Sequence, residues 1–195
     1  MVSVDASNVD KTGFFCLMSK PKALGYRQKR EWLEARFAEG MQLKILHGSG
    51  GRGFIEYTPA ESAWRVVNAP GYLVIHCLWV VGKGKGRGYG ARLLHECLED
   101  ARVQGKFGVV MVSSDETWLA KKRFFLRHGF EQVDQVPPSF QLLVQRFDTT
   151  APLPSFPHDW DSRQATFGAG PTVVRAPQCP YIEAAACGFV RMAQL

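Results

Sequence analysis

The chain has 195 residues, 46% hydrophobic and 22% charged, so it can bury one good core and part of a second. This composition excludes a disordered or fibrous protein. The formal net charge of +6 favours anionic partners, although a nucleotide cofactor, an RNA and a membrane surface would all fit it.

The start of the chain and its cysteines bear on where the protein works. The first residues lack the basic segment and apolar run of a signal peptide, and no later stretch is long and uncharged enough to span a bilayer. The five cysteines are odd in number and scattered, which argues against a disulfide framework, and no pair has metal-site spacing. The basic residues lack the interleaved aromatics of an RNA-binding surface. We therefore expect a cytoplasmic protein with no metal, membrane or nucleic-acid partner.

The first part of the chain predicts a helix followed by strands. The helix covers residues 26–37 and is closed by a glycine. Residues 41–46 and 54–57 flank a glycine-rich turn and predict an antiparallel hairpin, and residues 64–67 are a candidate extension of the same sheet. Residues 71–81 are almost continuously apolar, which predicts a strand buried on both faces in the middle of the sheet.

The next part predicts one βαβ unit and a closing hairpin. A helix from about residue 88 to 103 and a buried strand over 107–112 follow the glycine-rich loop at 82–90. Residues 118–129 predict a basic amphipathic helix, and residues 131–136 and 140–147 predict two strands. We therefore expect an α/β (α+β) domain over residues 1–147.

The remainder changes in composition. Residues 148–170 are rich in Pro, Ser, Thr, Asp and Gly, which predicts a linker or an extended segment on the surface. Residues 171–195 predict a short strand, a turn and a helix.

Every second residue from Gly82 to Gly90 is a glycine, with Lys83, Lys85 and Arg87 between them, directly before a helix. Bare backbone N–H groups, cations and the positive end of a helix suit a phosphate-rich ligand. A P-loop is excluded because no Lys-Ser/Thr follows the glycines. The dinucleotide fingerprint Gly-x-Gly-x-x-Ala fits residues 86–91, but the single βαβ unit comes late in the chain, which argues against a doubly wound sheet.

Residues 85–94 resemble the acetyl-CoA loop of the GNAT superfamily of N-acetyltransferases, Gln/Arg-x-x-Gly-x-Gly/Ala before a Leu-rich helix. The flanking strands resemble the family's fourth and fifth strands, and residues 122–130 its Phe-Tyr-x-x-x-Gly-Phe helix ending. The resemblance implies a mixed, mostly antiparallel twisted sheet flanked by helices. It also implies acetyl transfer from acetyl-CoA to an amine, of a small molecule or a protein, by direct attack; a homodimer is one option.

The resemblance implies a CoA site in which backbone N–H groups of the loop bind the pyrophosphate and a strand N–H, from Leu78 or Trp79, polarises the thioester. Lys85 stands where the family has Gln or Arg. The implied binding residues are Leu78, Trp79, Val80, Lys85, Gly86, Arg87, Gly88, Tyr89, Gly90, Ala91 and Phe125.

His76 matches a histidine that the serotonin N-acetyltransferase branch uses, and its ordinary pKa of about 6.5 suits a general base. A hydrogen-bonded core histidine is an equal alternative. Glu56 and Glu61 are other candidate bases that act through water. Phe125 replaces the tyrosine that serves the family as acid. Either Tyr89, Cys77 or water then protonates the thiolate, or CoA leaves as the thiolate unaided.

Two alternative functions remain open from the sequence. The missing acid at Phe125 favours a CoA-binding regulatory module without catalysis, and the dinucleotide fingerprint favours an NAD(P)-binding oxidoreductase.

Residues 173–182 resemble the opening strand and Cys-Pro-Tyr turn of thioredoxin-like folds, in particular the YoaP-like domain attached to some GNAT proteins. A helix N-terminus would make Cys179 reactive, but Ile182 replaces a second cysteine. A remnant packed on the first domain, with Cys179 inert, is an equal alternative.

Overall fold

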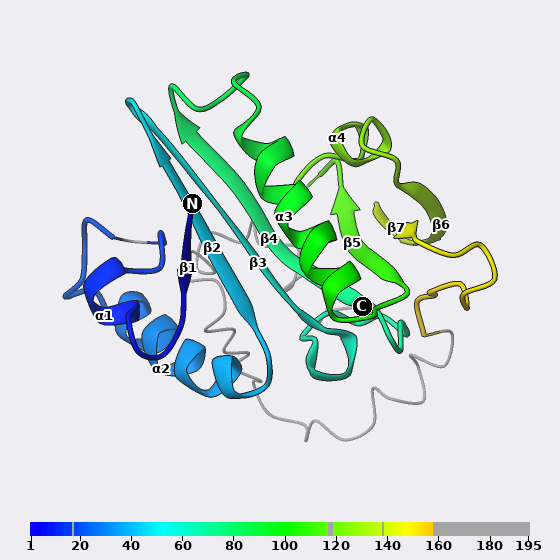
Figure 1. Cartoon of the computed structure of the whole chain (residues 1–195), viewed down its shortest axis with the longest axis horizontal. Helices are drawn as coiled ribbons and strands as arrows, with labels where there is room; N and C mark the ends of the chain where they lie inside the picture. Colours follow the sequence, from blue (N-terminus) through cyan, green and yellow to red (C-terminus); the bar gives the residue numbers. More distant parts are fainter. Residues whose placement is uncertain (17, 117–118, 138, 158–195) are drawn as a thin grey trace.

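The computed structural model describes residues 1–16, 18–116, 119–137 and 139–157 (Figure 1). A seven-stranded sheet runs through this part in the order β1-β2-β3-β4-β5-β7-β6. The strands are β1 (Val2–Val4), β2 (Gln42–Gly48), β3 (Gly51–Pro59), β4 (Leu73–Gly82), β5 (Gly108–Ser114), β6 (Glu131–Val136) and β7 (Phe140–Arg146). The helices are α1 (Val9–Thr12), α2 (Leu24–Ala38), α3 (Tyr89–Val103) and α4 (Lys122–Leu126), with a 3-10 helix at Ala60–Ser62.

The predicted fold class is confirmed. Among the strands that the structure describes, only β4 and β5 pair in parallel, and α3 joins them as one βαβ unit. β2 and β3 form the predicted hairpin, and the apolar strand β4 lies in the middle of the sheet. A doubly wound dinucleotide-binding sheet is mostly parallel and repeats the βαβ unit, so this topology contradicts the NAD(P) alternative.

Two predicted elements are wrong. Residues 64–67 form no strand, and residues 64–66 make a bend. Arg65 donates from Nη2 to the carbonyl oxygen of His76 (2.7 Å), which packs the segment beside β4 without a strand pairing. The helix predicted over 118–129 is reduced to the short α4. Just before it, the backbone at Lys121 is extended, and the Ser113 hydroxyl donates to the carbonyl oxygen of Ala120 (2.8 Å), which ties the approach to β5.

The two faces of the sheet carry different helices. Leu78 and Val80 of β4 pack into the core that contains the buried side of α3. Trp79 and Val81, which point the other way, pack with the residues of α1 and α2. The structure therefore has an α3 face and an α2 face, and Figure 1 shows α3 lying across the sheet.

Apolar burial and a polar anchor hold α3 on its face. The helix buries Leu93, Leu94, Cys97, Leu98 and Ala101. At its C-terminal half, Asp100 accepts hydrogen bonds from the hydroxyl of Tyr57 on β3 and from Nζ of Lys44 on β2 (2.9 Å). Burial and the Asp100 bond raise the pKa of Tyr57, so the phenol stays protonated. These bonds fix the position of α3, and so of its first turn, against the central strands.

β4 and β5 separate part-way along their length. They pair over only three residues, and the last pair is Ile75 with Met111. β4 then continues to Gly82 beside β3, while β5 continues beside β7. Figure 1 shows the two strands diverging toward the start of α3.

The start of the predicted linker packs on the sheet. The hydroxyl of Tyr72 donates to the carbonyl oxygen of Pro152 (2.6 Å), Asn68 pairs with Ser155, and Phe156 is buried. Residues 158–195, with Cys179 and the predicted strand and helix around it, lie outside the described residues. Within the described ranges, no helix combines the length and apolarity needed to cross a membrane.

Candidate active site

The glycine loop forms an open turn that leads into α3. Gly86 and Gly88 have positive φ angles of 74° and 76°, a conformation that costs a side chain about 1–2 kcal/mol. A Cβ at either position would have no heavy atom within 4 Å, so their backbone faces open space. The first intrahelical bond runs from Arg92 N to the Gly88 carbonyl (3.0 Å). The N–H groups of Tyr89, Gly90 and Ala91 lie in the first turn, where a helix offers no carbonyl oxygen to accept their hydrogen bonds.

The tip of the β2–β3 hairpin supports this loop. Lys83 N donates to the carbonyl oxygen of Gly50 (3.0 Å), and a Cβ on Gly51 would lie 2.1 Å from the nitrogen of Gly84. The ring of Tyr89 packs on Gly84 and its hydroxyl lies against Gly48. A glycine is required at position 51 because the two backbones touch there, and at positions 48 and 84 a side chain would meet the ring or hydroxyl of Tyr89. These contacts hold the loop at the end of β4.

The loop presents cations around its N–H groups. Lys83, Lys85 and Arg87 are exposed, while Gly84 between them is buried. Together with the dipole of a 15-residue helix, they make the region attractive to phosphate. The residues predicted from the CoA-loop pattern thus lie together at one end of the site.

His76 lies where β4 leaves β5, one residue after the last paired position. The register between β3 and β4 shifts at this point, so that His76 has no paired residue on β3. The imidazole is 3% exposed, and Nε2 accepts the backbone N–H of Trp64 (3.4 Å). Burial, with the nearby cations Arg65 and Lys29, holds the pKa of His76 well below its ordinary value. The ring is therefore neutral at physiological pH.

Glu56 is on β3, where it pairs with Cys77 of β4, the residue that follows His76. Its carboxylate is buried and pairs with Nζ of Lys29 from α2 (2.8 Å). The same ammonium lies 4.4 Å from the centre of the Trp32 ring. Burial, followed by the charge of Glu56, raises the pKa of Cys77, so this thiol stays protonated. His76, Glu56, Lys29 and Arg65 form a buried polar cluster on the α2 side of the point where the strands separate.

The other predicted catalytic residues lie elsewhere. The Tyr89 hydroxyl is at the Gly48 end of the hairpin, whereas His76 lies six residues back along β4 from Gly82, about 20 Å at the usual strand rise. Glu61 Oε1 accepts the N–H of Gly71 (2.8 Å), a structural bond at the start of the strand. Phe125 is fully buried against Phe130. The structure thus brings Glu56 and His76 together and does not bring Tyr89 to them.

Sequence reasoning missed Lys29 and Arg65. One signal was available for Lys29, which shares a helix face with Trp32 and Leu33 at spacings of three and four, so that a lysine lies in an apolar stripe. Arg65 gives no such signal because its position depends on the bend at residues 64–66.

Comparison with known proteins fits this geometry. Residues 23–130 match the Acetyltransferase (GNAT) family. The uncharacterized N-acetyltransferase YoaP of Bacillus subtilis (strain 168) is 33% identical over 183 residues, which cover 92% of this chain and 72% of that protein. The chain belongs to the GNAT acetyltransferase family. The prediction of an N-acetyltransferase that uses acetyl-CoA is confirmed by this membership, which contradicts the oxidoreductase alternative.

Two further acetyltransferases are similar to this chain at lower sequence identity. The L-methionine sulfoximine/L-methionine sulfone acetyltransferase of Pseudomonas paraeruginosa (strain DSM 24068 / PA7) is 29% identical over 125 residues, 63% of this chain and 69% of that protein. A GNAT acetyltransferase from Brucella melitensis, solved in complex with acetyl-CoA, is 18% identical with a TM-score of 0.49, covering 82% of this chain and 96% of that structure.

Proposed function

We propose that this GNAT protein transfers the acetyl group of acetyl-CoA to a small-molecule amine at the point where β4 and β5 separate. One observation carries this proposal: β4 runs without interruption from His76, at the end of its pairing with β5, to the glycine loop that opens α3. A long cosubstrate held by its phosphates at the loop would extend along β4 toward His76.

The donor side of the proposed site is the glycine loop. Backbone N–H groups of residues 86 and 88–91 bind the pyrophosphate, whereas Arg87 N donates to the carbonyl oxygen of Gly84 (3.2 Å). The exposed cations Lys83, Lys85 and Arg87 add charge. The open space at Gly86 and Gly88 supports this assignment, since phosphate oxygens must approach the backbone closely. A backbone N–H group in the stretch Leu78–Val80 polarises the thioester carbonyl in this proposal, which is supported by the end of the β4–β5 pairing at Ile75.

The acceptor side is the buried polar cluster. The amine nitrogen attacks the thioester carbon, the carbon–sulfur bond breaks, and His76 takes the proton that the amine loses. The lowered pKa of His76 keeps the ring neutral, with a lone pair for the proton, and it also makes the imidazole a weaker base than a free histidine. That lone pair lies on Nε2, where the Trp64 N–H bond is long at 3.4 Å and easily replaced. Glu56 is the alternative base, acting through water, but its contact with Lys29 makes it the weaker candidate.

The thiolate of CoA leaves and takes its proton from water. Phe125 carries no acidic proton, and the distance along β4 separates the Tyr89 hydroxyl from His76. Cys77, protonated and adjacent to His76, is the protein group nearest in sequence that could donate instead.

The acceptor and compartment follow from weaker observations. The Pseudomonas relative is named for its action on L-methionine sulfoximine and L-methionine sulfone, which are amino-acid derivatives and favour a small-molecule amine over a protein amine. Cys77 and Cys97 are free thiols, which favours the reducing cytoplasm. A homodimer stays one option for the assembly.

The test is release of free CoA from acetyl-CoA across a panel of amines. We expect at least one amine to give release above background, and His76→Ala to lower kcat by about 10²–10⁴-fold while acetyl-CoA still raises the melting temperature. Absence of turnover with every amine would leave a CoA-binding module, and a near-normal rate in folded His76→Ala would remove His76 as the base.

A further inference from the structure

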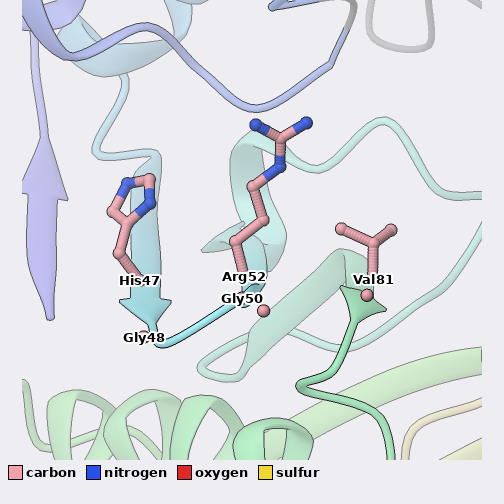
Figure 2. A pocket seen from close by; sticks show the side chains of 7 residues that line it. His47, Gly48, Gly50, Arg52 and Val81 are labelled. Atoms are coloured by element: carbon pink, nitrogen blue, oxygen red, sulfur yellow. The ribbon is translucent and has the colours of Figure 1, made fainter.

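A hollow of about 340 Å³ lies at the end of the sheet nearest the glycine loop. Its lining comes from the tip of the β2–β3 hairpin and the end of β4: His47, Gly48, Gly50, Gly51, Arg52, Val81 and Gly82. Figure 2 shows the side chains of His47, Arg52 and Val81 extending to the same side of the strands. The volume suits a small-molecule group.

The strand registers place this hollow on the α2 face. His47, Arg52 and Val81 form one row across β2, β3 and β4. The next row on the same face contains Phe54 and Trp79, both packed with the α1 and α2 residues. The third row contains Glu56, beside His76. The hollow therefore shares a face with the proposed acceptor side, and α3 lies on the opposite face.

The hollow is cationic. Arg52 and His47 are exposed, and no aspartate or glutamate is among the described residues that line it. In the part of the chain that the structure describes, Arg52 has no ion pair with a carboxylate. The side chain of Lys83, which the proposed function assigns to the phosphates of CoA, packs on Gly50 next to the hollow, so Arg52 is the cation left for an acceptor anion. Such a surface attracts anions, and a guanidinium can bind a carboxylate or phosphate through two hydrogen bonds.

The backbone beneath Arg52 carries strain that fixes its surroundings. In the described ranges, Phe15 is the one non-glycine residue with a positive φ, of 75°. Its ring stacks on Phe54 (4.4 Å between centroids) and lies 5.3 Å from Cζ of Arg52. Such a conformation costs about 1–3 kcal/mol and persists where the surroundings enforce it, often at binding sites. The stacked rings of Phe15 and Phe54 thus form an aromatic surface against the guanidinium of Arg52.

We propose that the hollow binds an anionic group of the acceptor through Arg52, so that the preferred substrates are elongated amines with a carboxylate or phosphate at the far end. This inference rests on the proposed acetyl transfer at His76. Arg52 lies four residues along β3 from Glu56, about 13 Å at the usual strand rise. Allowing for the reach of the arginine side chain, the amine and the anion are separated by roughly the length of a short peptide.

A phosphate of CoA is the other possible source of the anion. The position of the hollow on the α2 face favours the acceptor, because the first turn of α3, where the pyrophosphate binds in the proposed function, belongs to the α3 face.

The experiment measures kcat/KM for matched acceptors with and without the anionic group, using the full chain and acetyl-CoA. Suitable pairs are glycine peptides of one to four residues against their C-terminal amides, and an amino sugar phosphate against the free amino sugar. In the best pair, we expect kcat/KM at low salt to be at least tenfold higher for the anionic acceptor, because its KM is lower. The difference should be smaller at high salt, which screens the charges.

Arg52→Glu should abolish this preference, and Arg52→Lys should keep part of it. Arg102→Glu is the matched control, since it makes the same charge change at an exposed residue of α3 and should leave the preference intact. A parallel series with acetylated 3′-dephospho-CoA separates the two anion sources.

The inference is overturned, while acetyl transfer stands, if the wild type has an equal or higher kcat/KM for the neutral acceptors. It is likewise overturned if Arg52→Glu still prefers the anionic acceptors. A raised KM for acetyl-CoA in Arg52→Glu that disappears with the dephospho analogue assigns the hollow to the cosubstrate and also overturns it. Failure of every amine to release CoA overturns the proposed acetyl transfer itself, and the inference with it.

Discussion

The two sides of the proposed site are built in different ways. On the α3 side, one continuous stretch, residues 82–91, supplies the phosphate-binding groups, most of them backbone N–H groups exposed by glycines. On the α2 side, the polar groups are buried side chains from four separate segments: Lys29, Glu56, Arg65 and His76. A binding loop can thus be encoded locally, whereas the buried polar cluster exists only once the sheet and α2 have packed.

The largest effect should come from breaking the buried cluster. Glu56→Ala removes the carboxylate from a fully buried ammonium, and loss of one partner of such a pair costs about 3–5 kcal/mol of unfolding free energy. Replacing both partners, as Lys29→Met with Glu56→Leu, should recover most of that loss. Equilibrium denaturant unfolding measures both.

The exposed pair of Arg36 and Glu39 is the matched control, with a similar distance of 2.7 Å. Glu39→Ala should cost no more than about 1 kcal/mol, because solvent screens the pair. A Glu56→Ala loss as small as the Glu39→Ala loss would show that burial adds nothing to the pair in the cluster.

A substitution in the glycine loop should lower the affinity for acetyl-CoA more than it lowers the unfolding free energy. Gly88→Ala places a Cβ in open space but at a φ of 76°, which costs about 1–2 kcal/mol of unfolding free energy, and it should weaken acetyl-CoA binding by at least about tenfold. Gly105→Ala is a matched control after the C-terminus of α3, with a φ of 64° and equally open space. Isothermal titration with acetyl-CoA and denaturant unfolding separate the two effects. Equal loss of affinity in both variants would mean that backbone strain, not position in the loop, explains the change.

The same contrast explains how much the sequence could predict. Residues 82–91 and the strands around them follow from local patterns, since alternating glycines, an apolar run and a Leu-rich helix each bear on neighbours in sequence. The bend at Trp64 and Arg65 and the short α4 escaped prediction, because contacts with His76 and Ser113 override local preference there. His76 itself was found, but its neutral state was not, since that state depends on Lys29 from α2 and Arg65 from the bend.

The smallest effect concerns pH and tests the cluster without breaking it. The pKa of His76 is lowered in the folded state by burial, Arg65 and Lys29, with Glu56 and Cys77 also adjacent. Below about pH 6.5 the unfolded chain therefore binds a proton that the folded chain does not, so folding stability falls as pH falls through that range. The slope attributable to one proton is at most about 1.4 kcal/mol per pH unit. His76→Asn removes the titrating group, so unfolding free energies measured from pH 7.5 to 5 should fall less steeply in the variant than in the wild type. Parallel curves would mean that His76 titrates normally in the folded protein, and the lone pair proposed to take the amine proton would then be lost to protonation at mildly acid pH.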